Sequence, residues 1–234
     1  MTPAHSIVFL VDVDNTLLDN DRIRDDIQRH LEHEFGAYCR ERYWTIQEEL
    51  FVQLGYRDYL GALQLYRDEH PDEVEFLSMA SYLVDYPFGE RVFPHAREVL
   101  ERFQSWGRTV ILSDGDVVFQ PRKVERSGLA RVVGGHVLIY IYKEQSLDDV
   151  SRRYPADHYV LVDDKLRILT AVKEVWGERV TTVFPRQGQF AREQVIARYP
   201  AADLTVDRIG DLLDLDLPAF TAGRPIPRPA EVTR

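Results

Sequence analysis

The chain has 234 residues, and 44% of them are hydrophobic, which is enough for one large core or two smaller ones. Its 39 acidic and 29 basic residues give a formal net charge of -10, which argues against nucleic acid as the main partner. The single cysteine, Cys39, excludes a disulfide within the chain and argues against an extracellular scaffold. No apolar stretch has the length of a membrane span, so we expect a cytoplasmic protein without a membrane partner.

The first predicted element is a strand at 7–13, where an apolar run with several β-branched residues ends in aspartates. Such a run is typical of a parallel strand that is buried on both faces. Similar runs recur along the chain with helical patterns between them, which predicts a doubly wound parallel α/β sheet. The other strands are predicted at 109–112, 136–141, 159–162, 180–184 and 203–206, and the helices at 96–106, 120–127, 147–153 and 166–176.

One region, from about 21 to 88, contains helical patterns but no convincing strand. We interpret it as a helical cap at 20–89, inserted into a core formed by 1–19 and 90–216, with a hinge near Gly89. Such an insertion can close over a site and exclude water, although it could also simply widen the core. The tail at 217–234 is rich in proline and small residues, and we expect it to be extended or disordered.

Two aspartates, Asp12 and Asp14, follow the first predicted strand. Ligands of open α/β sheets bind beyond the carboxyl ends of the strands, so a functional site is expected here. Two carboxylates in this place are costly to desolvate unless a hard cation such as Mg²⁺ compensates them. One carboxylate can attack phosphorus, while the second protonates the leaving oxygen and later activates water. The alternative is that both residues only cap a helix or solvate a turn.

Three further predicted strands also end in polar residues. Ser113, together with the backbone N–H groups that begin at Asp114, could donate hydrogen bonds to a phosphate, although such a serine usually belongs to a turn. Lys143 would offset clustered carboxylates and bind phosphate, or it could be an exposed strand-end lysine. Asp163 and Asp164 form a second acidic strand end. The recurrence at four strand ends favours a common site over independent structural roles.

This series of strand ends resembles the four motifs of the haloacid dehalogenase-like (HAD) hydrolase superfamily, over most of the chain. The motifs are matched by residues 12–16, Ser113, Lys143 and the pair 163–164. The resemblance implies a Rossmann-like core and a required Mg²⁺. It implies that Asp12 is the nucleophile and a metal ligand, and that Ser113 and Lys143 hold phosphate. It further implies that Asp14 is the acid and base and gives its backbone carbonyl to the metal.

The fourth motif departs from the family pattern. Many relatives have Gly-Asp there and another aspartate a few residues later, so the resemblance implies that Asp164 binds the metal. Asp163 replaces the glycine and Ile168 stands where the later aspartate would be. We therefore expect Asp163 to supply the missing carboxylate, either directly or through water.

The insertion resembles the helical caps of the family's first cap class, found in phosphoglycolate phosphatase-like and nucleotidase-like relatives. The resemblance thus implies a Mg²⁺-dependent phosphatase that acts on a small phosphorylated metabolite. We expect a monomer or a homodimer, and the sequence does not distinguish the two. A phosphomutase of the β-phosphoglucomutase type, a metal-independent 2-haloacid dehalogenase and a non-catalytic binding protein remain alternatives. Asp14 argues against the dehalogenase, because that subgroup lacks the second aspartate of the first motif. The cap residues that could face the pocket, or be solvated helix positions, are Arg22, Arg24, Tyr56, Arg57 and Tyr59.

Overall fold

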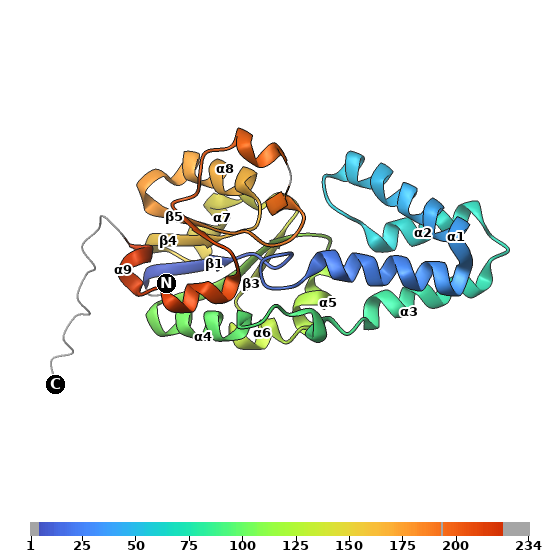
Figure 1. Cartoon of the computed structure of the whole chain (residues 1–234), viewed down its shortest axis with the longest axis horizontal. Coiled ribbons are helices and arrows are strands. Elements are labelled where there is room, and N and C mark those ends of the chain that lie inside the picture. Colours follow the sequence, from blue (N-terminus) through green and yellow to red (C-terminus); the bar gives the residue numbers. More distant parts are fainter. Residues whose placement is uncertain (1–4, 193, 222–234) are drawn as a thin grey trace.

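The structure, a computed structural model, describes residues 5–192 and 194–221. A six-stranded, entirely parallel sheet with the strand order β3-β2-β1-β4-β5-β6 forms its centre (Figure 1). The predicted α/β fold with a Rossmann-like doubly wound sheet is therefore confirmed. The strands are β1 (His5–Val11), β2 (Arg108–Asp114), β3 (Val137–Tyr140), β4 (Ala156–Val162), β5 (Val180–Pro185) and β6 (Leu204–Val206).

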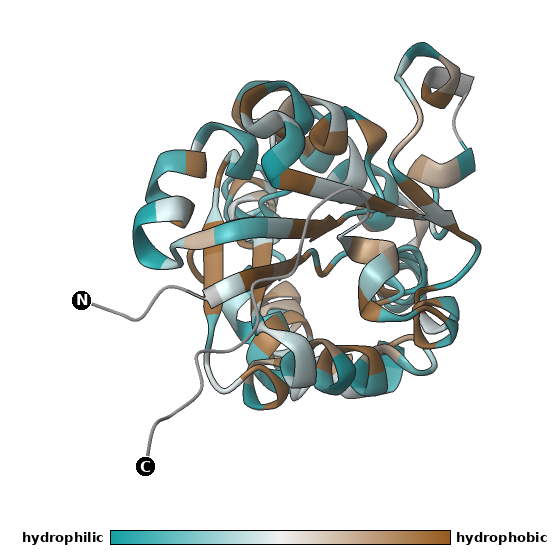
Figure 2. Cartoon of the chain, turned by 90° about the vertical axis from the view of Figure 1, so that its left-hand side faces the viewer, coloured by the Kyte–Doolittle hydropathy of each residue, from teal (hydrophilic) through white to brown (hydrophobic). Residues whose placement is uncertain are grey.

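Hydrophobic clusters cover both faces of the sheet, because successive side chains of the central strands alternate between them. Phe9 and Val11 of β1 belong to one cluster, and Val8 and Leu10 belong to the other. Figure 2 shows the largely hydrophobic strands at the centre of the molecule, between helices of mixed hydropathy. The helices around the sheet are α4 (Ala96–Trp106), α5 (Phe119–Arg126), α6 (Leu129–Val132), α7 (Leu147–Arg153), α8 (Leu166–Trp176) and α9 (Leu217–Phe220). The 3₁₀ helices of the chain are η1 (Val74–Leu77), η2 (Phe88–Arg91), η3 (Lys143–Gln145), η4 (Gly177–Arg179), η5 (Phe190–Arg192), η6 (Gln194–Arg198) and η7 (Ile209–Asp214).

The segment 20–89, all of which the structure describes, contains helices and no strand. Helices α1 (Asn20–Leu54), α2 (Tyr59–Glu69) and α3 (Ser78–Asp85) lie beyond one end of the sheet (Figure 1). Gly36 has φ 85° and ψ 167°, so α1 is two helices joined by a kink. These helices share a hydrophobic cluster that is separate from the two clusters of the sheet and that also contains Phe119 of α5. The boundaries of the core and the cap remain a prediction.

The two connections between the sheet and α1–α3 lie side by side. The backbone N–H of Asp19 donates to the carbonyl of Arg91 at 2.8 Å, and that of Phe93 donates to Leu17 at 2.9 Å. Leu18 and Val92 form an antiparallel bridge between these two contacts. The chain therefore enters and leaves the helical segment through one short two-stranded ribbon.

The beginning of the C-terminal segment differs from the prediction for 217–234. Instead of being extended or disordered, residues 217–220 form the short helix α9. The ring of Phe220 is fully buried and packs on the rings of Phe9, Phe103 and Trp106. Leu217 and Ala219 also pack against the core, and Thr181 Oγ1 donates to the carbonyl of Phe220 at 2.9 Å, so several contacts hold α9 in place. The rest of the predicted tail, 222–234, lies outside the described residues.

In the described part of the chain, no helix combines the length and the apolar character needed to cross a bilayer.

Candidate active site

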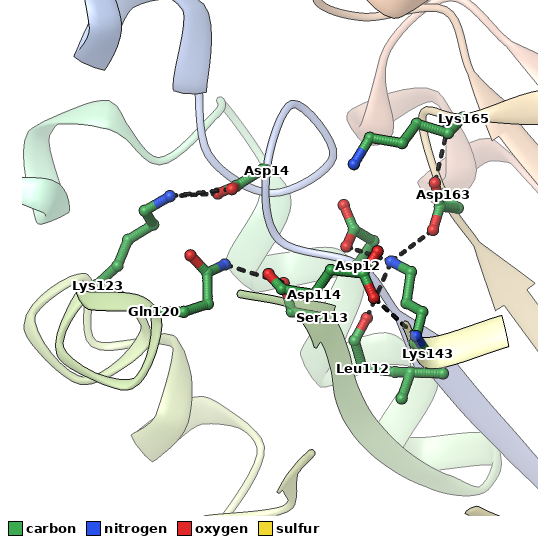
Figure 3. A network of polar contacts seen from close by, with 10 residues as sticks. All are labelled: Asp12, Asp14, Leu112, Ser113, Asp114, Gln120, Lys123, Lys143, Asp163 and Lys165. Atoms are coloured by element: carbon green, nitrogen blue, oxygen red, sulfur yellow. Dashed lines mark hydrogen bonds and ion pairs between the residues drawn. The ribbon is translucent and has the colours of Figure 1, made fainter. Parts of the chain in front are cut away.

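The loop after β1 directs its two aspartates to different places. The strand ends at Val11, so Asp12 and Asp14 both lie past it and need not share a face. The backbone N–H of Asp12 still donates to the carbonyl of Val162 in β4 at 2.9 Å, which holds Asp12 against the sheet. The chain then turns at Asn15, where φ is 57°. Figure 3 shows Asp12 among the polar ends of the central strands, whereas Asp14 points toward α5.

Three carboxylates meet at the carboxyl end of the sheet. Oxygens of Asp12, Asp163 and Asp164 all lie within 4.8 Å of one another. Lys143 lies among them, and its Nζ donates to Asp12 Oδ1 at 2.5 Å and lies 2.6 Å from Asp163 Oδ2. The contact between Lys143 Nζ and Asp163 Oδ2 is an ion pair and not a hydrogen bond, since Asp163 Oδ2 makes no hydrogen bond within the described part of the chain. The backbone N–H of Lys165 donates to the other Asp163 oxygen at 2.8 Å.

The electrostatics of this carboxylate cluster leave it short of positive charge. Burial raises the pKa of Asp12 to about 6, Lys143 opposes the shift, and Asp163 adds to it. Burial also raises the pKa of Asp164 well above its ordinary value; Lys165 opposes the shift, and Asp163 and Asp12 add to it. For Lys143, burial alone would lower the pKa, but the surrounding carboxylates raise it well above the ordinary value. The lysines thus compensate the cluster only in part.

The same residues offer unpaired oxygen ligands to a divalent cation. Within the described residues, Asp12 Oδ2 and both carboxylate oxygens of Asp164 are buried and have no hydrogen-bond partner. Unpaired buried carboxylate oxygens are rare in proteins unless an ion or water satisfies them. An all-oxygen set of this kind suits a hard cation such as Mg²⁺. The side chain of Asp14 is not part of this group, so its predicted contribution to a metal through the backbone carbonyl remains a prediction.

The side chain of Asp14 is instead paired with a lysine that the sequence analysis missed. Lys123 Nζ donates to both Asp14 oxygens, at 2.7 and 3.0 Å, and to Asn20 Oδ1 at 3.0 Å (Figure 3). Lys123 is buried, with 1% of its surface exposed. A signal for it exists in the sequence, because Lys123 lies on the same side of α5 as Phe119, Gln120 and Val124, where an apolar side chain would be the usual choice.

The residues after β2 form a second polar group. Ser113 Oγ accepts a hydrogen bond from Gln120 Nε2 at 2.9 Å, so Gln120 is another contact that the sequence analysis missed. Asp114 Oδ1 accepts from the backbone N–H of Lys143 at 2.8 Å and thereby ties the end of β2 to the loop after β3. A Cβ atom on Gly115 would lie 2.5 Å from that of Gln120, so only glycine permits this approach. The predicted phosphate-binding roles of Ser113, Asp114 and Lys143 remain predictions.

Comparison with known proteins then decides the family. A model of the haloacid dehalogenase-like hydrolases matches residues 8–173, which is most of the chain. The chain belongs to this family. It is a HAD-like hydrolase and therefore an enzyme. A search among curated proteins gave no match.

Solved structures of other HAD-like proteins support this assignment. A haloacid dehalogenase-like hydrolase from Burkholderia xenovorans LB400 is 57% identical, with a TM-score of 0.88, over 93% of this chain and 99% of that chain. The L-2-haloacid dehalogenase of Xanthobacter autotrophicus with chloropropionic acid covalently bound is 17% identical (TM-score 0.58, 89% of this chain and 97% of that chain). The HAD-hydrolase YfnB of Bacillus subtilis, bound to magnesium, is 13% identical (TM-score 0.60, 89% and 97%). The latter two share the fold alone.

This HAD-like hydrolase has a cavity of about 270 Å³ between the cap helices and the carboxyl end of the sheet. Asp14, Asp114 and Lys123 line it from the sheet side. Of the cap residues named from the sequence, Arg22 does not line the cavity. The four that do are Arg24, Tyr56, Arg57 and Tyr59.

Proposed function

We propose that this HAD-like hydrolase is a Mg²⁺-dependent phosphatase that hydrolyses a small phosphomonoester. The observation that supports this most directly is the buried group of Asp12, Asp163 and Asp164, which has carboxylate oxygens left without a partner. A second observation is the presence of Asp14, an additional carboxylate that lines the adjoining cavity and could serve as acid and base. The size of the cavity suits a small metabolite.

In the first half of the proposed reaction, Asp12 is the nucleophile. Lys143 donates to Asp12 Oδ1 and so fixes the carboxylate just beyond β1. A bond forms between one carboxylate oxygen of Asp12 and phosphorus, the bond from phosphorus to the ester oxygen breaks, and Asp14 gives a proton to the departing alkoxide. Because Lys123 binds both oxygens of Asp14, one of these hydrogen bonds must open when Asp14 carries the proton.

In the second half, water attacks the phosphorus of the aspartyl-phosphate, and Asp14 accepts a proton from it. The bond from phosphorus to Asp12 breaks, and inorganic phosphate leaves. Lys143 and the Ser113 hydroxyl contact the phosphoryl oxygens through both steps, so that positioning and electrostatic stabilisation supply most of the rate enhancement. Asp12, Asp163 and Asp164 would hold Mg²⁺, which neutralises charge on a phosphoryl group that is being transferred.

The test is release of inorganic phosphate from a panel of phosphomonoesters at neutral pH, with Mg²⁺ and then with a chelator. We expect turnover that needs the metal, and we expect Asp12→Asn to abolish it while the fold persists. Asp148→Asn, at an exposed position of α7, is the matched control and should keep full activity. Full activity of Asp12→Asn would remove the nucleophile assignment.

A 2-haloacid dehalogenase is the second candidate, because the fold is shared with the Xanthobacter autotrophicus enzyme. It would also use Asp12, but it would need neither the metal nor Asp14. Release of chloride from 2-chloropropionate in the presence of a chelator would establish it and overturn the phosphatase. A phosphomutase would instead convert a sugar phosphate to its isomer with little release of free phosphate, and a non-catalytic binding protein would form no product at all.

A further inference from the structure

Two arginines line the cap side of the cavity and are held by aromatic rings. Arg24 lies on α1, and Arg57 lies in the connection between α1 and α2. Their guanidinium carbons lie 5.4 and 5.9 Å from the ring centre of Trp44, and Arg57 is also 5.0 Å from that of Phe51. Such stacking restricts a guanidinium group without using its N–H donors.

Neither arginine uses all of its donors. Arg24 Nη1 donates to the neutral amide of Gln189 at 2.6 Å, and its Nε is buried without an acceptor among the described residues. Arg57 Nη2 pairs with Glu48 at 2.9 Å, yet its Nη1 is likewise buried and unmatched there. Buried donors on charged groups are costly to leave unpaired, which points to a partner that binds from the cavity.

A tyrosine adds a third donor next to them. Tyr59 is 3% exposed, and its hydroxyl has no partner within the described ranges. Burial raises the pKa of Tyr59 to about 12; Arg24 and Arg57 oppose the shift, and Asp14 and Glu48 add to it. The ring is fixed by Phe119 of α5, with 4.7 Å between the ring centres.

The other cations that line the cavity already have carboxylates close to them. Lys123 is paired with Asp14, Arg167 is paired with Glu144 at 2.6 Å, and Lys165 lies beside the carboxylate cluster. Arg24 forms no ion pair within the part of the chain that the structure describes. Arg57 shares its charge with Glu48, so among the described cap residues that line the cavity it is Arg24 whose charge is left for a ligand.

We infer that Arg24, Arg57 and Tyr59 form a subsite for an anionic group on the leaving part of the substrate, and that this group is a carboxylate. This inference rests on the proposed phosphatase function and adds the substrate class: a small phosphomonoester that also carries a carboxylate. The phosphoryl group binds at the sheet end near Asp12, and the carboxylate binds at the cap end. A planar carboxylate matches the paired donors of a guanidinium group.

The kinetic test compares 3-phosphoglycerate with glycerol 3-phosphate, which has a neutral CH₂OH group in place of the carboxylate. We expect kcat/KM to be about tenfold to a hundredfold higher for 3-phosphoglycerate, as charge-assisted hydrogen bonds allow. Arg24→Gln and Arg57→Gln should abolish the preference, because kcat/KM for 3-phosphoglycerate should fall toward the value for glycerol 3-phosphate. Arg22→Gln, two positions from Arg24 on the exposed side of α1, is the matched control and should keep the preference. Equal kcat/KM values in the wild type would overturn the inference.

A binding experiment separates this inference from the proposed function. Titration calorimetry measures the binding of 3-phosphonopropionate and of 3-phosphonopropanamide, in which an uncharged amide replaces the carboxylate and the phosphonate is kept. This measurement needs no turnover. Tighter binding of the carboxylate, lost in Arg24→Gln and partly kept in Arg24→Lys, would support the subsite even if no ester were hydrolysed. Equal affinity of both probes would overturn it even if esters were hydrolysed. A preference for 1,3-propanediol bisphosphate over both phosphoglycerate and glycerol phosphate would identify a second phosphate and contradict the carboxylate.

Discussion

Replacement of the nucleophile should make the metal-free protein more stable. Asp12 is 2% exposed, and burial raises its pKa from 3.8 to about 6. One pKa unit corresponds to about 1.36 kcal/mol, so ionised Asp12 lowers the free energy of unfolding by about 3 kcal/mol at neutral pH. Asp12→Asn removes the charge and keeps the shape. We therefore expect the chelated variant to be more stable than the wild type by about this amount.

A competing effect is the loss of the ion pair between Asp12 and Lys143. Removing one partner of a buried pair is strongly destabilising when the other charge is left alone. Here Lys143 keeps Asp163 at 2.6 Å, so its charge remains compensated. The relief of carboxylate burial and repulsion should thus exceed the loss of the pair.

The pH dependence gives a check on the sign. Because the folded-state pKa of Asp12 is raised, the stability that its protonated form provides is fully present below pH 3.8 and is lost as the pH rises through about 6. The wild type and Asp12→Asn should therefore have similar stability near pH 4 and differ fully above pH 6. Urea unfolding, followed by fluorescence in the presence of a chelator, measures both. A variant less stable than the wild type at pH 7 would refute the reasoning, and Asp148→Asn should show no such change.

Three further predictions concern residues outside the carboxylate cluster. Lys123→Met should lower kcat of the proposed phosphatase at least about tenfold with little change in KM, because Asp14 loses the side chain that orients it. Unchanged steady-state kinetics would show that the pair of Lys123 and Asp14 is only structural. Phe220→Ala should lower the free energy of unfolding by about 3–5 kcal/mol, measured by urea unfolding, and a loss below about 1 kcal/mol would mean that α9 does not dock as described. Burial alone would raise the pKa of Asp26, but hydrogen bonds, including one from Arg91, outweigh this and lower it. Asp26 therefore contributes stability that is present above pH 3.8 and is lost as the pH falls through the lowered pKa, so Asp26→Asn should flatten the acid limb of a stability-against-pH curve. An unchanged acid limb would contradict this assignment.

Much of the fold and the centre of the site could be predicted because they depend on local patterns. Apolar runs revealed the strands, and the carboxyl ends of parallel strands meet at one edge whatever the loops between them do. Residues as distant in sequence as Asp12, Lys143 and Asp164 could therefore be expected to lie together.

Contacts that depend on tertiary packing could not be predicted in this way. Lys123 pairs with an aspartate that is 109 positions away, and although its place on the inner side of α5 indicates burial, the local pattern does not show which carboxylate it contacts. Helix α9 was missed because proline and small residues indicate disorder, whereas the burial of Phe220 depends on tertiary contacts with the rings of Phe9 and Phe103. The separate directions of Asp12 and Asp14 depend on where β1 ends, which is the least certain part of any strand prediction.

The ribbon formed by residues 17–19 and 91–93 has a consequence for how such a protein can change. Since the chain departs from the sheet and returns to it at one spot, the distance between the two junctions does not depend on what is inserted there. An insert of another length can join the same two junctions if it also covers Phe119 of α5, which packs against Tyr59 of the present segment. Replacing residues 20–89 with the corresponding segment of a relative should therefore exchange the residues on the cap side of the cavity, while the residues at the carboxyl end of the sheet stay in place.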